Sequence, residues 1–382
     1  MGISRKERSS WCESKYEEHL SLLKTLAAIP APSHQEEKRA EFIRNWLLSA
    51  GADNVYIDSA KNVVFPFCCR EKEPFLLCMA HTDVVFPDLT PLPVREENGR
   101  LYAPGVGDDT ANVAAMLLCI QFLLSHPGAY MEPTLFVFNS CEEGLGNLKG
   151  IRQIMKDHPG RVREMVSFDL QSNAIIRRAV GSERWEITVS TRGGHSYGDF
   201  GNANAIACLS ELICQLYRQN VPDKENTKTT FNVGTISGGT SVNTIAQSAS
   251  ITYEYRSDDQ ECLRIMSDQF HHILETAKNM DAVFSVKSIG NRPCGGIIDE
   301  KHHATLIKRC RDALRSVYSQ EPVLCSGSTD ANIPLSMRIP AVTFGLYRGG
   351  GAHTRQEFVE LDSLTPGLNI ALNFFLSDTI ED

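Results

Sequence analysis

The sequence has no long hydrophobic run, no block of basic residues and no Cys-x-x-Cys pair. No apolar stretch approaches the roughly 20 residues of a membrane-spanning helix, and the polar start at residues 1–6 is not a signal-peptide core. The net charge of −9 argues against nucleic-acid binding, which would need a basic stripe. Most of the 12 cysteines lie in apolar runs, where a thiol packs as a small hydrophobe. We therefore expect a soluble, cytoplasmic protein without a nucleic-acid or membrane partner.

The 382 residues exceed the usual size of one domain, so two domains are expected. Predicted strands alternate with helices up to about residue 180 and again after Pro293, which is typical of a doubly wound, mainly parallel α/β sheet. The middle of the chain instead shows half-exposed strands in the order βαββαβ. We predict a catalytic α/β domain of residues 1–180 and 291–382, with an inserted ferredoxin-like α+β domain of residues 181–290.

The apolar run at residues 75–85 predicts a buried strand that ends in His81-Thr82-Asp83. Open α/β sheets bind ligands beyond the carboxyl ends of their strands, so these residues lie where a site is expected. Asp83 would orient the ring of His81, although a purely structural histidine also fits this position. Upstream, Ser33 and Glu36 have the spacing of a capping box that opens a helix.

Further acidic and histidine residues follow other predicted strands. The pair Asp108-Asp109 precedes a predicted helix, where acids are also common as plain N-caps. Glu142-Glu143 and Asp169 follow two buried strands, and His353 lies in a glycine-rich loop. Gathered at one edge, this mixture of nitrogen and oxygen ligands suits zinc, manganese or cobalt, and a carboxylate bridging two metals about 3.5 Å apart is typical of two-metal hydrolases.

At these residues the sequence resembles the co-catalytic di-zinc metallopeptidases, a family that includes peptidase T, carboxypeptidase G, carnosinase, aminoacylase and succinyl-diaminopimelate desuccinylase. The resemblance covers nearly the whole chain. Its motifs occur in the family's order: His81 with Asp83, Gly105 to Asp109, Glu142 to Gly144, Asp169, Gly193 to Ser196, Gly238 to Asn243, Arg256, Ser328 to Asp330, and His353. One departure is Thr110-Ala111-Asn112, where the family often has Lys-Gly after the paired acids.

The resemblance implies a phosphorylase/hydrolase-like catalytic domain with two divalent metal ions, zinc first and manganese or cobalt as alternatives. It implies that one metal is held by His81 and Asp169. The other would be held by Glu143 and His353, and Asp108 would bridge them.

The family also implies roles for the residues around the metals. The peptide bond between Asp108 and Asp109 would be cis, and Asp83 would orient His81. Glu142 would be the general base that takes a proton from the metal-bridging water and passes it to the leaving amine.

The inserted domain resembles the family's lid and dimerisation domain, which implies a homodimer. His195 resembles the histidine that reaches an active site across the dimer and stabilises the developing oxyanion. Asn243 and Arg256 match substrate-binding positions, and the planar guanidinium of Arg256 suits a carboxylate.

The resemblance also indicates a substrate. An aspartate at the position of Asp169 is typical of family members that cleave short peptides with a free amino terminus, which favours an aminopeptidase or di-/tripeptidase similar to peptidase T. An N-acyl-amino-acid amidohydrolase or a carboxypeptidase is the alternative. In a different class, the chain would be a non-catalytic homologue that only binds peptides.

Overall fold

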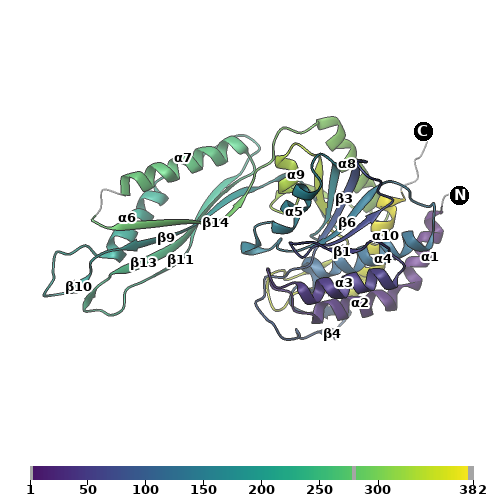
Figure 1. Cartoon of the computed structure of the whole chain (residues 1–382), viewed down its shortest axis with the longest axis horizontal. Helices are drawn as coiled ribbons and strands as arrows, with labels where there is room; N and C mark the ends of the chain where they lie inside the picture. The colour runs from purple at the N-terminus through teal and green to yellow at the C-terminus, as the bar shows by residue number, and fades with distance from the viewer. Residues whose placement is uncertain (1–2, 278–280, 377–382) are drawn as a thin grey trace. The chain divides into compact units, whose positions relative to one another are not determined.

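The computed structural model describes residues 3–277 and 281–376. The chain divides into two compact units. Unit 1 comprises Met1–Arg178 and Ile297–Asp382, and unit 2 comprises Ala179–Gly296. Both are drawn in Figure 1, and each is described by itself below.

Unit 1 is built on an eight-stranded sheet with the order β1-β2-β6-β3-β7-β16-β8-β15. In that order the strands are Tyr56–Ile57, Val63–Phe67, Thr134–Asn139, Phe75–His81, Val162–Phe168, Ala341–Phe344, Ala174–Ala179 and Val323–Gly327. The four central strands β6, β3, β7 and β16 are parallel, whereas β1, β2 and β8 pair with their neighbours in antiparallel fashion. The predicted doubly wound sheet is confirmed, with a parallel centre and antiparallel flanks.

Helices cover both faces of this sheet, with α2, α3 and α4 on one side and α5 and α9 on the other (Figure 1). The helices of unit 1 are α1 Arg5–Ser14, α2 Tyr16–Ala28, α3 Glu37–Ser49, α4 Asn112–Ser125, α5 Lys149–Asp157, α8 Glu300–Arg315, α9 Asn332–Ser336 and α10 Leu364–Phe375. Because both faces are covered, every residue of β3 and β6 is buried. That is why β3 is an uninterrupted apolar run rather than an alternating one.

A second, smaller sheet of unit 1 has the order β17-β18-β5-β4. Its strands are Gly349–Gly350, Phe358–Glu360, Arg100–Tyr102 and Arg95–Glu97. It brings the chain around residue 353 next to the segment that leads from β5 into α4. That segment contains an irregular turn, Val106–Ala111, in which the Asp108–Asp109 peptide bond is cis, as the family resemblance predicts.

One helical stretch within the described residues, Val106–Ser125, is long and apolar enough by composition to cross a membrane. The expectation that no stretch approaches that length was therefore wrong for this segment. Of its most apolar window, 89% is buried inside the protein, as in the core helix of a globular domain.

Unit 2 has a four-stranded antiparallel sheet with the order β11-β13-β9-β14. Its elements are β9 Gly181–Ser190, α6 Ala205–Tyr217, β11 Thr229–Gly238, β13 Ser248–Ser257, α7 Gln260–Ala277 and β14 Val283–Arg292. Along β13, buried residues such as Ile251, Tyr253 and Tyr255 alternate with half-exposed ones, because the helices pack on one face of the sheet. The chain order βαββαβ is the predicted ferredoxin-like pattern.

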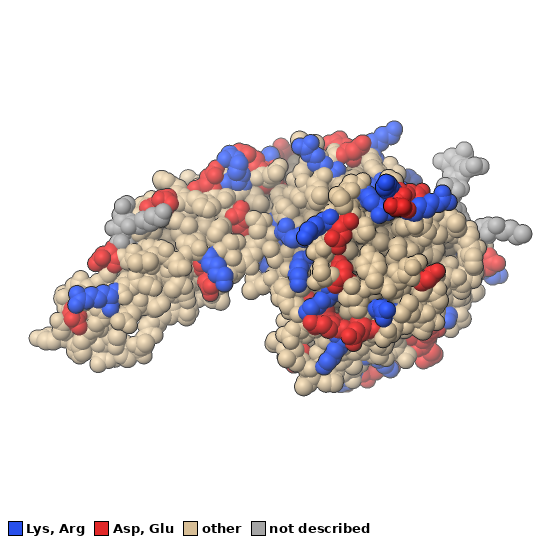
Figure 2. Space-filling view, in the orientation of Figure 1, with Lys and Arg blue, Asp and Glu red and all other residues tan. Residues whose placement is uncertain are grey.

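On the face of the molecule shown in Figure 2, Lys and Arg side chains are interspersed with Asp and Glu side chains. No continuous basic stripe crosses the described residues on that face. A nucleic-acid footprint would require such a stripe.

His19 in α2 provides a test of the core of unit 1. Its side chain is buried, and burial lowers the pKa of His19 from 6.5 to about 4. As the pH falls below 6.5, the unfolded chain binds a proton at His19 that the folded chain does not accept until about pH 4. The free energy of unfolding therefore decreases through this window, by up to about 3 kcal/mol at about 1.36 kcal/mol per pKa unit.

From pH 7 to pH 5, the free energy of unfolding should fall by about 2 kcal/mol less in the His19→Phe variant than in the wild type. Phenylalanine fills a similar volume but cannot ionise. Urea unfolding of both proteins at the two pH values measures the difference. An equal loss in both proteins would show that His19 is not the group that titrates.

Candidate metal centre

The site lies beyond the carboxyl ends of three adjacent parallel strands. His81 is the last residue of β3, Asp169 directly follows β7, and Glu142 and Glu143 lie shortly after β6. Because the strands run parallel and in register, their ends meet at one edge of the sheet, the usual ligand position in this architecture. The irregular turn before α4 adds Asp108, and the loop between β17 and β18 adds His353.

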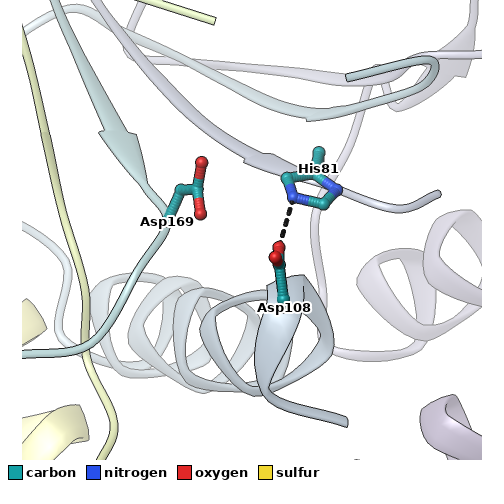
Figure 3. Close-up of side chains that lie close together, drawn as sticks. All are labelled: His81, Asp108 and Asp169. Atoms are coloured by element: carbon teal, nitrogen blue, oxygen red, sulfur yellow. Dashed lines mark hydrogen bonds and ion pairs between the residues drawn. The ribbon is translucent and has the colours of Figure 1, made fainter. Parts of the chain in front are cut away.

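These side chains form three overlapping groups in which the potential ligand atoms lie within 4.8 Å of one another. The first group is drawn in Figure 3, where His81, Asp108 and Asp169 converge from three segments. The groups are His81 with Asp108 and Asp169; Asp108 with Glu143 and His353; and His81 with Glu142 and Glu143. The structure thus brings together every residue that the sequence predicts as a ligand, together with the predicted base.

Asp108 lies at the centre of this arrangement. Its Oδ1 is 2.9 Å from Nε2 of His81, and its Oδ2 is 3.1 Å from Nε2 of His353. The same Nε2 of His353 lies 3.1 Å from Oε1 of Glu143. Because each oxygen of one carboxylate faces a different histidine, Asp108 has the geometry of a bridging ligand.

The pKa shifts reflect buried carboxylates crowded together, an arrangement that positive charge would stabilise. Hydrogen bonds to Asp108 and Glu143 raise the pKa of His353 to about 10. Burial, and after it the nearby charge of Asp108, raises the pKa of Asp169 to about 7. Burial would also raise the pKa of Asp108, but hydrogen bonds from His353 and His81 lower it overall. Divalent cations would supply this positive charge, and the nitrogen and oxygen donors suit them.

Asp83 holds the turn that carries the acidic pair. Its carboxylate accepts hydrogen bonds from the backbone N–H groups of Glu142 at 2.9 Å and Glu143 at 3.0 Å. The ring of His81 instead meets the backbone carbonyl of Asp83, 3.0 Å from Nδ1, with the carboxylate at 3.5 Å. Asp83 therefore positions the two glutamates as well as the histidine.

The predicted capping box was wrong. α3 begins at Glu37 and its N-cap has no side-chain hydrogen bond. The hydroxyl of Ser33 donates to Asp83 at 2.6 Å. The carboxylate of Glu36 accepts from the backbone N–H groups of His34 and Cys141, at 2.8 and 3.1 Å. Both side chains stabilise the site because buried N–H and carboxylate groups there need partners.

Other supporting contacts were not predicted from the sequence. The carboxylate of Asp109 accepts from the backbone N–H of His81 at 2.9 Å and from the amide of Asn112 at 2.6 Å. The buried guanidinium of Arg39 donates to the carbonyl of Thr82 at 2.8 Å and to the hydroxyl of Thr110 at 3.3 Å. The sequence signals were Asp109, as a member of the acidic pair, and Asn112, a polar residue at the start of an apolar helix.

Three predicted site residues lie in unit 2. His195 is exposed in β10, Gly194–His195, and its Nδ1 accepts from the backbone N–H groups of Tyr197 and Gly198 at 3.3 and 3.2 Å. Asn243 lies next to this segment, because its backbone carbonyl accepts a hydrogen bond from the backbone N–H of Ser196 at 3.0 Å. Because Nδ1 accepts these two hydrogen bonds, Nε2 is the ring nitrogen that can donate one.

Arg256 does not lie beside His195 and Asn243. It lies at the other end of β13, opposite Ser182 of β9. Its guanidinium pairs with the carboxylate of Glu254 through two contacts of 3.0 Å.

The fold and the site together define a metal-dependent hydrolase: an α/β sheet gathers histidines and carboxylates around Asp108. Residues 77–377 match the family described as Peptidase family M20/M25/M40. The chain belongs to this family, which confirms the resemblance seen in the sequence. Its members are metal-dependent peptidases and amidohydrolases.

Three relatives illustrate the range of the family. Succinyl-diaminopimelate desuccinylase of Corynebacterium glutamicum is 24% identical over 355 residues, which cover 90% of this chain and 92% of that protein. The structure of a tripeptidase from Staphylococcus aureus has a TM-score of 0.75 at 21% identity, covering 95% of this chain and 98% of that one. A dinuclear metal-binding peptidase of Bacillus subtilis has a TM-score of 0.68 at 17% identity, covering 96% and 98%.

Proposed function

We propose that this chain is an aminopeptidase or di-/tripeptidase, which hydrolyses a peptide bond in short peptides with a free amino terminus. Asp169 is the observation that carries the proposal. It follows β7 directly and lies in one ligand group with His81 and Asp108. In the family, an aspartate at this position is typical of peptidases of this kind, whereas a glutamate is typical of deacylases and carboxypeptidases.

We propose that the site holds two zinc ions, with manganese or cobalt as alternatives. His81 and Asp169 would bind one ion, Glu143 and His353 the other, and Asp108 both. The ligand groups and the two-sided contacts of Asp108 support this assignment. When bound, the ions polarise the scissile carbonyl and lower the pKa of the attacking water.

Glu142 is the proposed general base. It is 5% exposed and shares a ligand group with His81 and Glu143, but it belongs to neither of the groups that contain Asp108. Asp83 fixes its backbone at 2.9 Å. A carboxylate in that position takes a proton from the attacking water and then donates it to the leaving amine.

Unit 2 would complete the site in a homodimer. His195 would donate its Nε2 proton to the developing oxyanion, Asn243 would contact the substrate, and Arg256 would exchange Glu254 for a substrate carboxylate. Two almost fully exposed aromatic side chains close to His195 support an interface there, since Tyr197 and Phe200 are each 90% exposed. The free cysteines support a reducing compartment such as the cytoplasm.

An N-acyl-amino-acid deacylase is the second candidate, because the desuccinylase relative covers 90% of this chain. It would use the same ligands and the same base on a different acyl group. A non-catalytic peptide-binding protein is disfavoured, because the chain retains every predicted ligand together with Glu142.

Three matched substrates separate these candidates. The metal-loaded protein is incubated with an unblocked tripeptide, the same tripeptide with an acetylated amino terminus, and an N-acetyl amino acid. We expect cleavage of the unblocked tripeptide alone, because a free amino terminus is what the proposed site selects. Cleavage of the N-acetyl amino acid alone would overturn the peptidase proposal in favour of a deacylase.

A further inference from the structure

Glu357 is a buried acid that the proposed mechanism does not use. It is 1% exposed and lies in the loop between β17 and β18, four residues after His353. Its carboxylate accepts three backbone hydrogen bonds, from the N–H groups of Gly105 at 3.1 Å, Gly107 at 2.8 Å and Asp108 at 2.7 Å. Charge-assisted bonds of this kind are the strong ones in proteins.

The backbone of residues 105–108, which Glu357 holds, is also constrained by its own conformation and by close packing. Gly105 has a φ of 70° in the left-handed region. At Gly107 the ring of Tyr347 packs so closely that a Cβ would lie 2.6 Å from its hydroxyl. The backbone of Glu357 takes part as well, because its carbonyl accepts from the N–H of Ala103 at 3.2 Å. Main chain and side chain of one residue thus fix the segment that ends in Asp108.

Glu357 therefore connects two ligand-bearing segments. The N–H of Asp108 is bound to Glu357, while the carboxylate of Asp108 faces His353, which belongs to the same loop as Glu357. Moving Glu357 would change the separation between the bridging aspartate and this histidine. Residues that orient metal ligands through hydrogen bonds generally contribute to metal affinity, and mutating them weakens metal binding.

We infer that Glu357 is a positioning residue. It sets the affinity for the metal ion that Asp108, Glu143 and His353 would hold. The inference rests on the proposed two-metal function. A purely structural acid would affect folding stability and leave metal affinity unchanged.

The test is the Glu357→Gln variant, in which an amide N–H₂ replaces one of the accepting oxygens and faces a backbone donor. Zinc affinity is measured by competition with a chromophoric chelator, and the cobalt-loaded protein is examined by visible absorption. We expect one of the two metal equivalents to bind about 10–100-fold more weakly, with an altered cobalt spectrum. Glu360→Gln is the matched control, since Glu360 is half-exposed in β18 and lies near Arg100 and Arg348.

Equal metal affinity in Glu357→Gln, Glu360→Gln and the wild type would overturn the inference. If Glu357→Gln does not fold, Glu357→Asp decides, because it keeps the charge but is one methylene shorter: unchanged affinity there, or failure to fold, assigns Glu357 a structural role. The proposed function fails separately, by absence of metal binding in the wild type.

Discussion

The Glu142→Gln variant is expected to bind its metals normally and to lose about 10²–10⁴-fold in kcat, the usual contribution of a general base. Glutamine has nearly the same size but cannot accept the proton of the attacking water. Because Asp83 holds Glu142 through its backbone N–H, the substitution should leave the turn in place. Hydrolysis of the preferred substrate and the metal content of the purified variant are measured together.

Glu143→Gln is the matched comparison, one residue along the same turn. Oε1 of Glu143 lies 3.1 Å from Nε2 of His353 within a ligand group. We therefore expect Glu143→Gln to lose metal, whereas Glu142→Gln should retain it. Full activity in a metal-loaded Glu142→Gln protein would contradict its role as the base.

Removal of the metals should have the largest effect. After treatment with a chelator, we expect activity to fall by more than roughly 1,000-fold, since metal ions contribute several kcal/mol at about 1.36 kcal/mol per tenfold in rate. Dialysis into zinc, manganese or cobalt should restore it, and the metal that gives the highest activity identifies the best candidate for the native ion. Activity that persists in the metal-free protein would exclude this mechanism.

The parts of the site that could be predicted from the sequence follow from local pattern. β3 is buried on both faces, so it is an apolar run, and His81 ends that run where ligand sites occur in parallel sheets. Asp169 follows β7 in the same way. The ferredoxin-like order of unit 2 follows from alternation along strands such as β13.

The supporting contacts could not be predicted, because they join residues far apart in the chain. Glu357 binds the N–H of Asp108 across 249 residues, and Asn112 accepts from the N–H of Leu346 across 234. Ser33 and Glu36 show a further reason. A serine and a glutamate three residues apart are compatible with a local helix cap and also with two tertiary hydrogen bonds. Here the buried carboxylate of Asp83 binds Ser33 and the buried N–H of Cys141 binds Glu36, so the tertiary bonds form instead of the cap.

The most direct test of the two-metal account is the anomalous diffraction of crystals grown with zinc. The account predicts two peaks about 3.5–4 Å apart, on either side of the Asp108 carboxylate, one beside His81 and Asp169 and the other beside Glu143 and His353. A single peak, or peaks away from Asp108, would contradict it.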